Sequence, residues 1–116
     1  MKTIMIVDDE ADNRSTVKTV LEKNGYKVVT AVSGDDCLKK LPKQKVDLIL
    51  LDIMMPGKPV KEVVNSIKNP VIFLSAVRMS EAEKEKLFDT KNIIGFIEKP
   101  FDLDRLLKSV QKAIGK

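Results

Sequence analysis

Five short apolar runs recur along the chain, and they constrain its fold more than any other feature. They lie at residues 3–7, 27–32, 46–51, 71–74 and 93–97. Several are continuous rather than alternating, such as Leu48-Ile49-Leu50-Leu51. Strands that are apolar on both faces are typical of a parallel sheet, because helices cover both faces of such a sheet.

The segments between these runs have the apolar spacing of helices. Two stripes follow the spacing i, i+3, i+4, i+7: Val60, Val63, Val64 and Ile67 in a helix predicted over about 60–68, and Leu103, Leu106, Leu107, Val110 and Ile114 in the last one. Asn24-Gly25 predicts the end of a helix over about 12–23, since glycine adopts the left-handed conformation without a Cβ clash. Ser80 and Glu83 fit a capping box for a helix over about 81–88, and Ser33 with Asp36 is a weaker case.

Strand and helix therefore alternate five times within 116 residues, a length that suits one domain over residues 1–116. This order predicts an α/β fold with a single doubly wound, five-stranded parallel sheet and right-handed crossovers. Periodicity alone leaves the strand order open. Ligands of such sheets bind beyond the carboxyl ends of the strands, so the residues there are the candidate site.

Composition excludes several kinds of chemistry. The chain has no histidine, which rules out histidine-based triads, histidine-ligated metals and a phosphohistidine carrier role. Cys37 is the only cysteine, so disulfides are excluded, and we interpret it as a small core residue. The net charge of +4 comes from scattered lysines without stacking aromatics, so direct nucleic-acid binding is not expected. Without a membrane-length apolar run or a signal peptide, we expect a cytoplasmic protein with no membrane contact.

Polar residues end four of the five predicted strands. They are Asp8-Asp9-Glu10, Asp52, Ser75-Ala76 and Glu98-Lys99-Pro100. Crowded carboxylates from Asp8, Asp9 and Asp52 need a counter-charge, for which Mg²⁺ (or Mn²⁺) is suited. A lysine and a hydroxyl suit a phosphoryl group, and a carboxylate can accept one. Taken singly, Asp8 and Asp9 could cap a helix, and Asp52 could be a turn residue at the end of a strand.

The chain resembles the receiver domains of two-component response regulators, the CheY-like superfamily, over essentially its whole length. Four motifs carry this resemblance, in the order and at the spacing of the family: IMIVDDE at 4–10, DLILLDIMMPG at 47–57, PVIFLSA at 70–76 and EKPF at 98–101. The resemblance implies a flavodoxin-like strand order of 2-1-3-4-5.

The resemblance also implies roles for individual residues. Asp52 would be the phospho-acceptor, assisted by Lys99 and Ser75. Mg²⁺ would be held by Asp9, by Asp52 and by the backbone carbonyl of Met54, with Asp8 acting through water. Ser75 and Phe96 would form a switch, and the Lys99-Pro100 peptide would be cis.

By the same resemblance the protein is a signalling switch rather than an enzyme. A histidine kinase or histidine phosphotransfer protein would donate the phosphoryl group. Phosphorylation would then change the surface of the fourth helix, fifth strand and fifth helix, which a downstream protein reads. The chain ends at Lys116, after the predicted fifth helix, so we expect a stand-alone receiver, although a piece excised from a larger regulator would look identical. A monomer and a phosphorylation-dependent dimer both fit.

Two other functions fit parts of this pattern. An aspartate-nucleophile phosphohydrolase would carry a second Asp two residues after the nucleophile, where this chain has Met54, which cannot transfer protons. A pseudo-receiver would bind partners without accepting phosphate, but it does not need the full set of Asp9, Asp52, Ser75 and Lys99.

Overall fold

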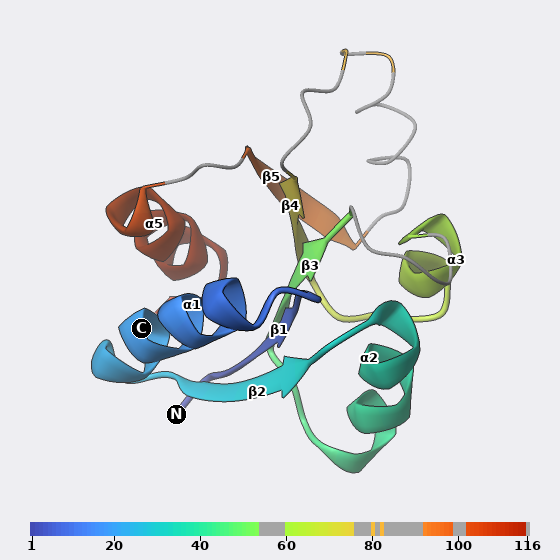
Figure 1. The fold of residues 1–116 in the computed structure, drawn as a ribbon, viewed down its shortest axis with the longest axis horizontal. Coiled ribbons are helices and arrows are strands. Elements are labelled where there is room, and N and C mark those ends of the chain that lie inside the picture. The colour runs from blue at the N-terminus through green and yellow to red at the C-terminus, as the bar shows by residue number, and fades with distance from the viewer. Residues whose placement is uncertain (54–59, 76–79, 81, 83–91, 99–101, 116) are drawn as a thin grey trace.

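A five-stranded parallel sheet forms the middle layer of the protein (Figure 1). The computed structural model describes residues 1–53, 60–75, 80, 82, 92–98 and 102–115. The strands run in the order β2-β1-β3-β4-β5, which confirms the order implied by the resemblance. Their bounds are β1 (Thr3–Val7), β2 (Lys27–Ala31), β3 (Leu48–Asp52), β4 (Val71–Ser75) and β5 (Ile93–Glu98).

Helices cover both sides of this sheet, as the doubly wound fold requires. Helices α1 (Ala11–Lys23) and α5 (Leu103–Ile114) pack on one side, and α2 (Gly34–Lys40) and α3 (Val60–Asn65) on the other, with a short 3-10 turn over Leu41–Lys43 (Figure 1). Apart from residue 82, the predicted helix over 81–88, with Glu83 of its cap, lies outside the described residues. No described helix combines the length and apolar character needed to cross a bilayer.

The strands alternate their side chains between two separate cores. Ile4 and Ile6 of β1 point to the α1 and α5 side, while Met5 and Val7 point to the α2 and α3 side. The central strands β3 and β4 are buried at every position, which confirms the prediction from their continuous apolar runs. The outer strands are only partly covered, and Ile94 of β5 is 49% exposed. Burial on both faces is therefore a property of the central strands β3 and β4.

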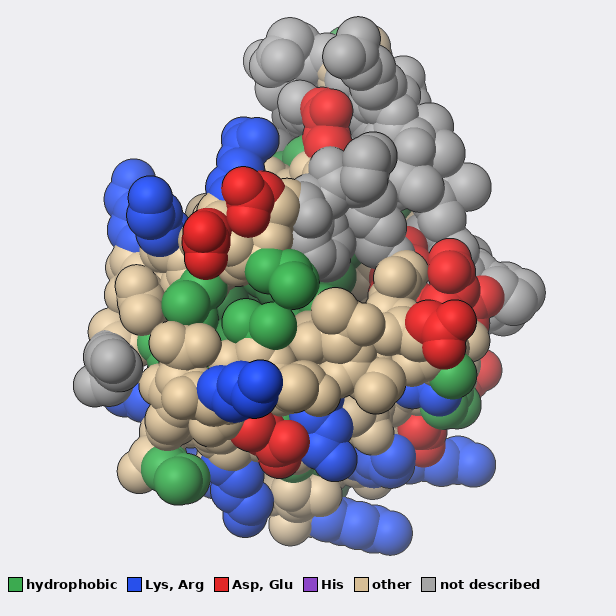
Figure 2. All heavy atoms as spheres, turned by 60° about the vertical axis from the view of Figure 1, so that its left-hand side comes forward, with side chains coloured by type: hydrophobic (Ala, Val, Ile, Leu, Met, Phe, Trp, Pro, Cys, Tyr) green, Lys and Arg blue, Asp and Glu red, His purple; other side chains and the backbone are tan. Residues whose placement is uncertain are grey.

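Charged side chains of both signs cover the outside of the α1 and α5 layer. Figure 2 shows Lys and Arg interspersed with Asp and Glu on that side, around a small hydrophobic area. In the part of this face that the structure describes, no continuous basic stripe runs across it. This distribution agrees with our interpretation of the lysines as solvated surface residues.

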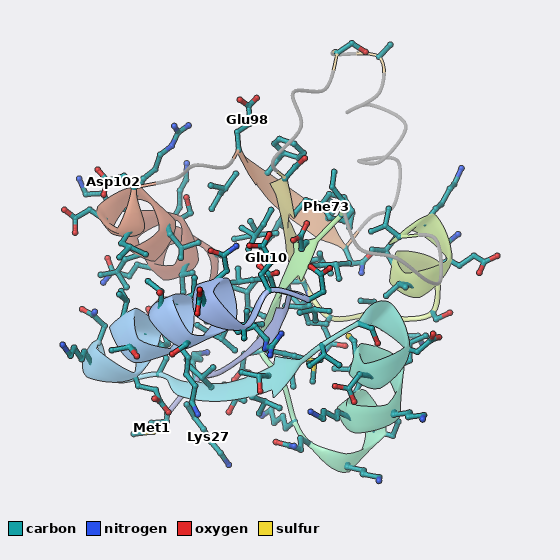
Figure 3. All side chains as sticks on the ribbon, viewed as in Figure 1. Met1, Glu10, Lys27, Phe73, Glu98 and Asp102 are labelled. Atoms are coloured by element: carbon teal, nitrogen blue, oxygen red, sulfur yellow. The ribbon has the colours of Figure 1, made fainter. Side chains whose placement is uncertain are left out.

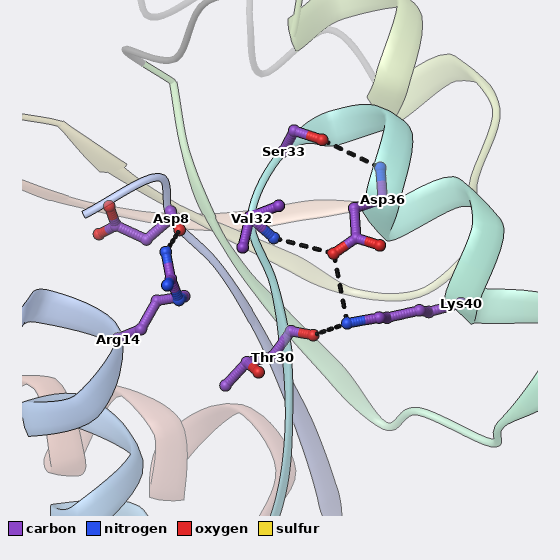
Figure 4. Close-up of polar contacts among 7 residues, drawn as sticks. All are labelled: Asp8, Arg14, Thr30, Val32, Ser33, Asp36 and Lys40. Carbon is purple, nitrogen blue, oxygen red and sulfur yellow. Dashed lines mark hydrogen bonds and ion pairs between the residues drawn. The ribbon is translucent and has the colours of Figure 1, made fainter. Parts of the chain in front are cut away.

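Local capping signals set two of the element ends as predicted. Helix α1 ends at its cap residue Asn24, and Gly25 follows with φ of 89°, the left-handed region that suits glycine. At the start of α2 the Ser33 hydroxyl accepts a hydrogen bond from the Asp36 amide at 3.1 Å (Figure 4). The Ser33 half of this weaker signal is thus confirmed, whereas the Asp36 carboxylate accepts from the Val32 amide, one residue before the amide that a capping box predicts.

A small polar network ties α2 to the end of β2 (Figure 4). The Asp36 carboxylate accepts from the Val32 amide at 3.0 Å and pairs with Lys40 at 3.2 Å. The Lys40 ammonium also donates to the Thr30 carbonyl at 2.6 Å. The hydrogen bond from Val32, together with Lys40, lowers the pKa of Asp36 below its usual range.

Helix α3 is shorter than its apolar spacing predicted. It ends at Asn65 rather than near residue 68. The following amides, of Ser66 and Ile67, bond to carbonyls three residues back, so the chain tightens instead of continuing the helix. Pro70 disfavours helical backbone at Asn69, whose side chain donates to the Val46 carbonyl at 2.8 Å. A local signal, the proline, and a contact across 23 residues thus both favour a non-helical chain after α3.

The packing of α2 on α3 yields a stability prediction. A Cβ built on Gly34 would lie 2.6 Å from Cγ2 of Val63, a stiff β-branched side chain that is 1% exposed. Gly34→Ala should therefore lower the free energy of unfolding by about 1 kcal/mol or more through overpacking, measured by urea denaturation. In the Gly34→Ala/Val63→Ala double variant the loss should be smaller than the sum of the single losses. A stabilised Gly34→Ala protein would contradict the predicted clash.

A second prediction concerns Cys37, which is fully buried in α2 as expected for a core residue. Burial, with a smaller contribution from Asp36, raises the pKa of its thiol to about 11. The neutral thiol therefore stabilises the fold below the unfolded pKa, and this contribution is lost as the pH rises from about 9 to about 11.

The free energy of unfolding should accordingly fall more steeply between about pH 8 and pH 10 in the wild type than in Cys37→Ala, by about 1 kcal/mol. Denaturation curves of both proteins at the two pH values measure the difference. Burial also raises the pKa of Tyr26, but both proteins keep that group, so it cancels. Parallel pH profiles would show that Cys37 does not titrate as described.

Candidate functional site

The carboxyl ends of β1 and β3 lie side by side at one edge of the sheet. In their parallel pairing Val7 is opposite Leu51, so the next residues of the two strands, Asp8 and Asp52, are neighbours. Paired strands lie about 4.8 Å apart, which puts the two aspartates in adjacent positions. The fold thus brings together two acidic residues that are 44 positions apart in the sequence.

The next two strands bring Ser75 and Glu98 to the same edge. Asp52 is opposite Leu74 of β4, and Ser75 is opposite Glu98 of β5. The Ile53 amide donates to the Leu74 carbonyl at 3.0 Å, so the ladder continues one residue past Asp52. Asp52 therefore lies within hydrogen-bonded backbone rather than in a loose turn, which was the alternative interpretation of this residue.

Burial singles out the same residues. Among the described residues the buried polar side chains are Asp8 (1% exposed), Asp52 (3%) and Ser75 (0%), and all three lie at this edge. Carboxylates are rarely buried to this degree, because removing a charge from water is costly unless other groups compensate. A concentration of buried polar groups at one end of a parallel sheet marks the candidate site.

Three consecutive carboxylates form a tight acidic cluster after β1. Oxygens of Asp8, Asp9 and Glu10 all lie within 4.8 Å of one another, with Asp8 buried and the other two exposed. The Glu10 amide donates to Oδ1 of Asp8 at 2.9 Å, which folds the turn back on itself. Figure 3 labels Glu10 at the carboxyl ends of the strands. We predicted Asp8 and Asp9 in a cluster with Asp52, whereas the third member of this one is Glu10.

The donors of this cluster fit a divalent cation. Carboxylate oxygens are the ligands that Mg²⁺ and Mn²⁺ prefer, and two exposed members leave room for the waters that Mg²⁺ retains. Three like charges this close also repel one another, and a cation removes that repulsion. The residues present therefore suit the metal implied by the resemblance.

Sequence patterns did not single out Arg14, which also lies at this edge. Its Nη1 donates to the backbone carbonyl of Asp8 at 2.7 Å (Figure 4). Glu10 was likewise not assigned a role, although its position directly after Asp8-Asp9 was a usable signal. For Arg14 the only signal was its place in the first turns of the helix that follows the acidic residues.

Ser75 and Phe96 lie on the same side of the sheet, in neighbouring strands. Phe96 is opposite Phe73 of β4, two residues before Ser75, and it packs against the core on the α2 and α3 side. An irregularity in the pairing of β4 with β5 advances β5 by one residue, since Val71 is opposite Ile93 but Ile72 is opposite Gly95. This shift turns Phe96, rather than Gly95, to that side.

Three of the predicted site residues, Met54, Lys99 and Pro100, lie outside the described residues. The metal role of the Met54 carbonyl, the phosphoryl contact of Lys99 and the cis Lys99-Pro100 peptide therefore stay predictions. The described edge contains Asp8, Asp9, Asp52 and Ser75, with Phe96 in the neighbouring strand.

Comparisons with known proteins agree with this geometry. The profile of the response regulator receiver domain family matches residues 4–111. Protein PilG of Pseudomonas aeruginosa is 34% identical over 113 residues, which are 93% of this chain and 84% of PilG. The sensor kinase/phosphatase CqsS of Vibrio cholerae is 32% identical over 115 residues, although the chain spans only 17% of that longer protein.

Solved structures show the same fold. The chemotaxis protein CheY4 of Vibrio cholerae superimposes with a TM-score of 0.89 at 29% identity, covering 97% of this chain and 98% of that one. The response regulator TrrA of Thermotoga maritima, solved in complex with Mg²⁺ and BeF, gives 0.82 at 32% identity, with 97% and 99% covered. With the family profile spanning nearly the whole sequence, this chain belongs to the receiver domains of two-component response regulators.

Proposed function

We propose that this receiver domain accepts a phosphoryl group on Asp52 in a Mg²⁺-dependent reaction and thereby switches a partner-binding surface. The observation that carries the proposal is the placement of Asp52, a 3% exposed carboxylate at the end of a central strand, next to Asp8. Buried carboxylates are costly to the fold, but they are useful at a site that binds a cation and accepts a phosphoryl group.

The donor would be a phosphohistidine of a histidine kinase or histidine phosphotransfer protein, since this chain has no histidine of its own. An oxygen of Asp52 attacks phosphorus, and a P–O bond forms as the P–N bond to the donor breaks. The electron pair of that bond returns to the imidazole, which takes up a proton from water. The protein needs little more than in-line positioning and charge neutralisation for such a transfer.

The residues that would hold Mg²⁺ are Asp9 and Asp52 through carboxylates, Met54 through its carbonyl and Asp8 through water. Bound there, the cation neutralises charge on the transferring phosphoryl group. The cluster of Asp8, Asp9 and Glu10 supports this assignment and adds Glu10 as a nearby carboxylate. The relative TrrA was solved with Mg²⁺ and BeF, and beryllofluoride mimics a phosphoryl group. That structure supports a site for a metal and a phosphoryl group in this chain.

Ser75 and Phe96 would convert the added phosphoryl group into a change of surface. The Ser75 hydroxyl would donate to a phosphoryl oxygen, as would the Lys99 ammonium, and Phe96 would turn into the space that Ser75 leaves. Their position on one side of neighbouring strands supports this coupling. A shift from rare to dominant needs about 5 kcal/mol of differential interaction, which a few charge-assisted hydrogen bonds can supply.

The surface read by a downstream protein would include β5 and α5. A hollow of about 450 Å³ lies between these elements, and its lining includes Phe96, Ile94, Ser109 and Lys112. The Phe96 ring packs on the other side of β5, against the α2 and α3 core, so its turn would reach this hollow through the backbone of the strand. Its apolar floor and single lysine suit a partner with an apolar segment and an acidic residue.

A phosphorylation assay tests the acceptor. Asp52→Asn should take up no label from radioactive acetyl phosphate with Mg²⁺, because an amide is not a competent nucleophile here. Asp12→Asn is the matched control, since it removes an exposed carboxylate from α1 and should label like the wild type. Label retained by Asp52→Asn would refute the assignment. Rapid, repeated hydrolysis of a small phosphate ester would instead indicate the phosphohydrolase.

The switch and its metal are tested with beryllofluoride, a phosphoryl mimic. With Mg²⁺ it should shift the amide signals of Ser75 and Phe96 in NMR spectra, and removal of the metal with EDTA should reverse the shifts. Asp9→Asn should require about tenfold more Mg²⁺, whereas Asp12→Asn should not. Unchanged Ser75 and Phe96 signals in the wild type would indicate a pseudo-receiver.

A further inference from the structure

The acidic cluster depends on a turn whose backbone is held from several directions. Asp8 donates its amide to the Ala31 carbonyl of β2 at 3.1 Å, and its carboxylate accepts from the Glu10 amide at 2.9 Å. Its carbonyl accepts from Nη1 of Arg14 at 2.7 Å (Figure 4). Each polar group of Asp8 therefore has a contact, and the one to its carbonyl comes from the body of helix α1.

Helix α1 begins without the usual side-chain cap. Glu10 is the N-cap residue, and its carboxylate does not bond the free amides of the first turn. That carboxylate instead belongs to the cluster with Asp8 and Asp9. The N-cap side chain therefore does not satisfy a first-turn amide, as such a side chain usually does. The charge-assisted bond from Arg14 to the Asp8 carbonyl gives the helix a side-chain contact with the end of β1.

We propose that Arg14 is a positioning residue for the metal site: it holds the Asp8 carbonyl so that the carboxylates of Asp8 and Asp9, with Glu10 beside them, keep the positions that Mg²⁺ binding needs. The inference rests on the proposed Mg²⁺ site. It deepens that proposal, because it assigns the shape of the site to a residue outside the ligand set. The planar guanidinium suits this task, since it presents its donors in a fixed geometry.

Electrostatics alone predicts the opposite effect of Arg14. A positive side chain beside three carboxylates competes with a cation, so its removal should strengthen Mg²⁺ binding. Positioning predicts that its removal weakens binding, because the carboxylates lose their common orientation. The guanidinium bonds a carbonyl rather than a carboxylate oxygen in this contact, which favours the positioning role. The sign of the change in affinity separates the two roles.

A matched control exists on the next strand. Lys40 of α2 donates to the Thr30 carbonyl near the end of β2 at 2.6 Å. In the same way, Arg14 of α1 donates to the Asp8 carbonyl at the end of β1. Both contacts tie a basic helix residue to a strand-end carbonyl. The Lys40 contact lies outside the acidic cluster, so its loss should lower stability without altering metal affinity. Lys40→Met thus separates a general structural effect from positioning of the site.

The experiment is a Mg²⁺ titration at constant ionic strength, followed by the amide signals of residues 8–13, for the wild type, Arg14→Met, Arg14→Lys and Lys40→Met. Circular dichroism first establishes that each protein is folded. Arg14→Met should bind Mg²⁺ about tenfold more weakly, Arg14→Lys should lie between it and the wild type, and Lys40→Met should stay within about twofold of the wild type. Without metal, the Glu10 amide should exchange with solvent faster in Arg14→Met.

Each other outcome has a definite meaning. Stronger binding by Arg14→Met, or affinity within about twofold of the wild type, overturns the positioning role while leaving the Mg²⁺ site intact. An equal loss in Arg14→Met and Lys40→Met also overturns it, because the effect would then be general destabilisation. A wild type that shows no saturable Mg²⁺ response refutes the proposed function itself. If Arg14→Met does not fold, the order of affinities of Arg14→Lys and the wild type decides.

Discussion

The parallel pairing of β1 with β3 is the interaction on which the site depends. It places Val7 opposite Leu51, and from that register the neighbouring positions of Asp8 and Asp52 follow without further assumption. A slip of one residue would turn every side chain of β1 to the other face of the sheet. Two apolar cores, one on each side, prevent such a slip, because each accepts a different alternate set of β1 side chains. Hydrophobic packing thus aligns acidic groups that repel one another.

The burial of Asp8, Asp52 and Ser75 runs against the rule that the rest of the sheet follows. Strands β3 and β4 are otherwise apolar and fully covered, and polar side chains occur only where each strand ends. Such local departures are expected at functional sites, where the fold supplies the compensation. Here the Glu10 amide supplies part of it at Asp8, and bound metal would supply more. The same strands therefore carry a stabilising apolar core along their length and costly buried polar side chains at their carboxyl ends.

Several features could be predicted from local sequence because they depend on neighbouring residues alone. The five apolar runs, the end of α1 at Asn24-Gly25 and the cap at Ser33 are of this kind, and all were confirmed. The residues of the site were also found locally, because polar residues interrupt apolar runs at strand ends. The strand order was not, since it came from resemblance to a family; periodicity describes a strand but not its neighbours.

By itself, the sequence determined the alternation of strands and helices, the exclusion of histidine chemistry and the identity of Asp8, Asp9, Asp52 and Ser75 as candidates. Only the tertiary structure decided the side of the sheet that Phe96 occupies and the contact of Arg14 with the Asp8 carbonyl. The reason is physical. Periodicity and capping act over a few residues, whereas strand register, pairing irregularities and side-chain contacts with a distant backbone depend on which segments the folded chain brings together.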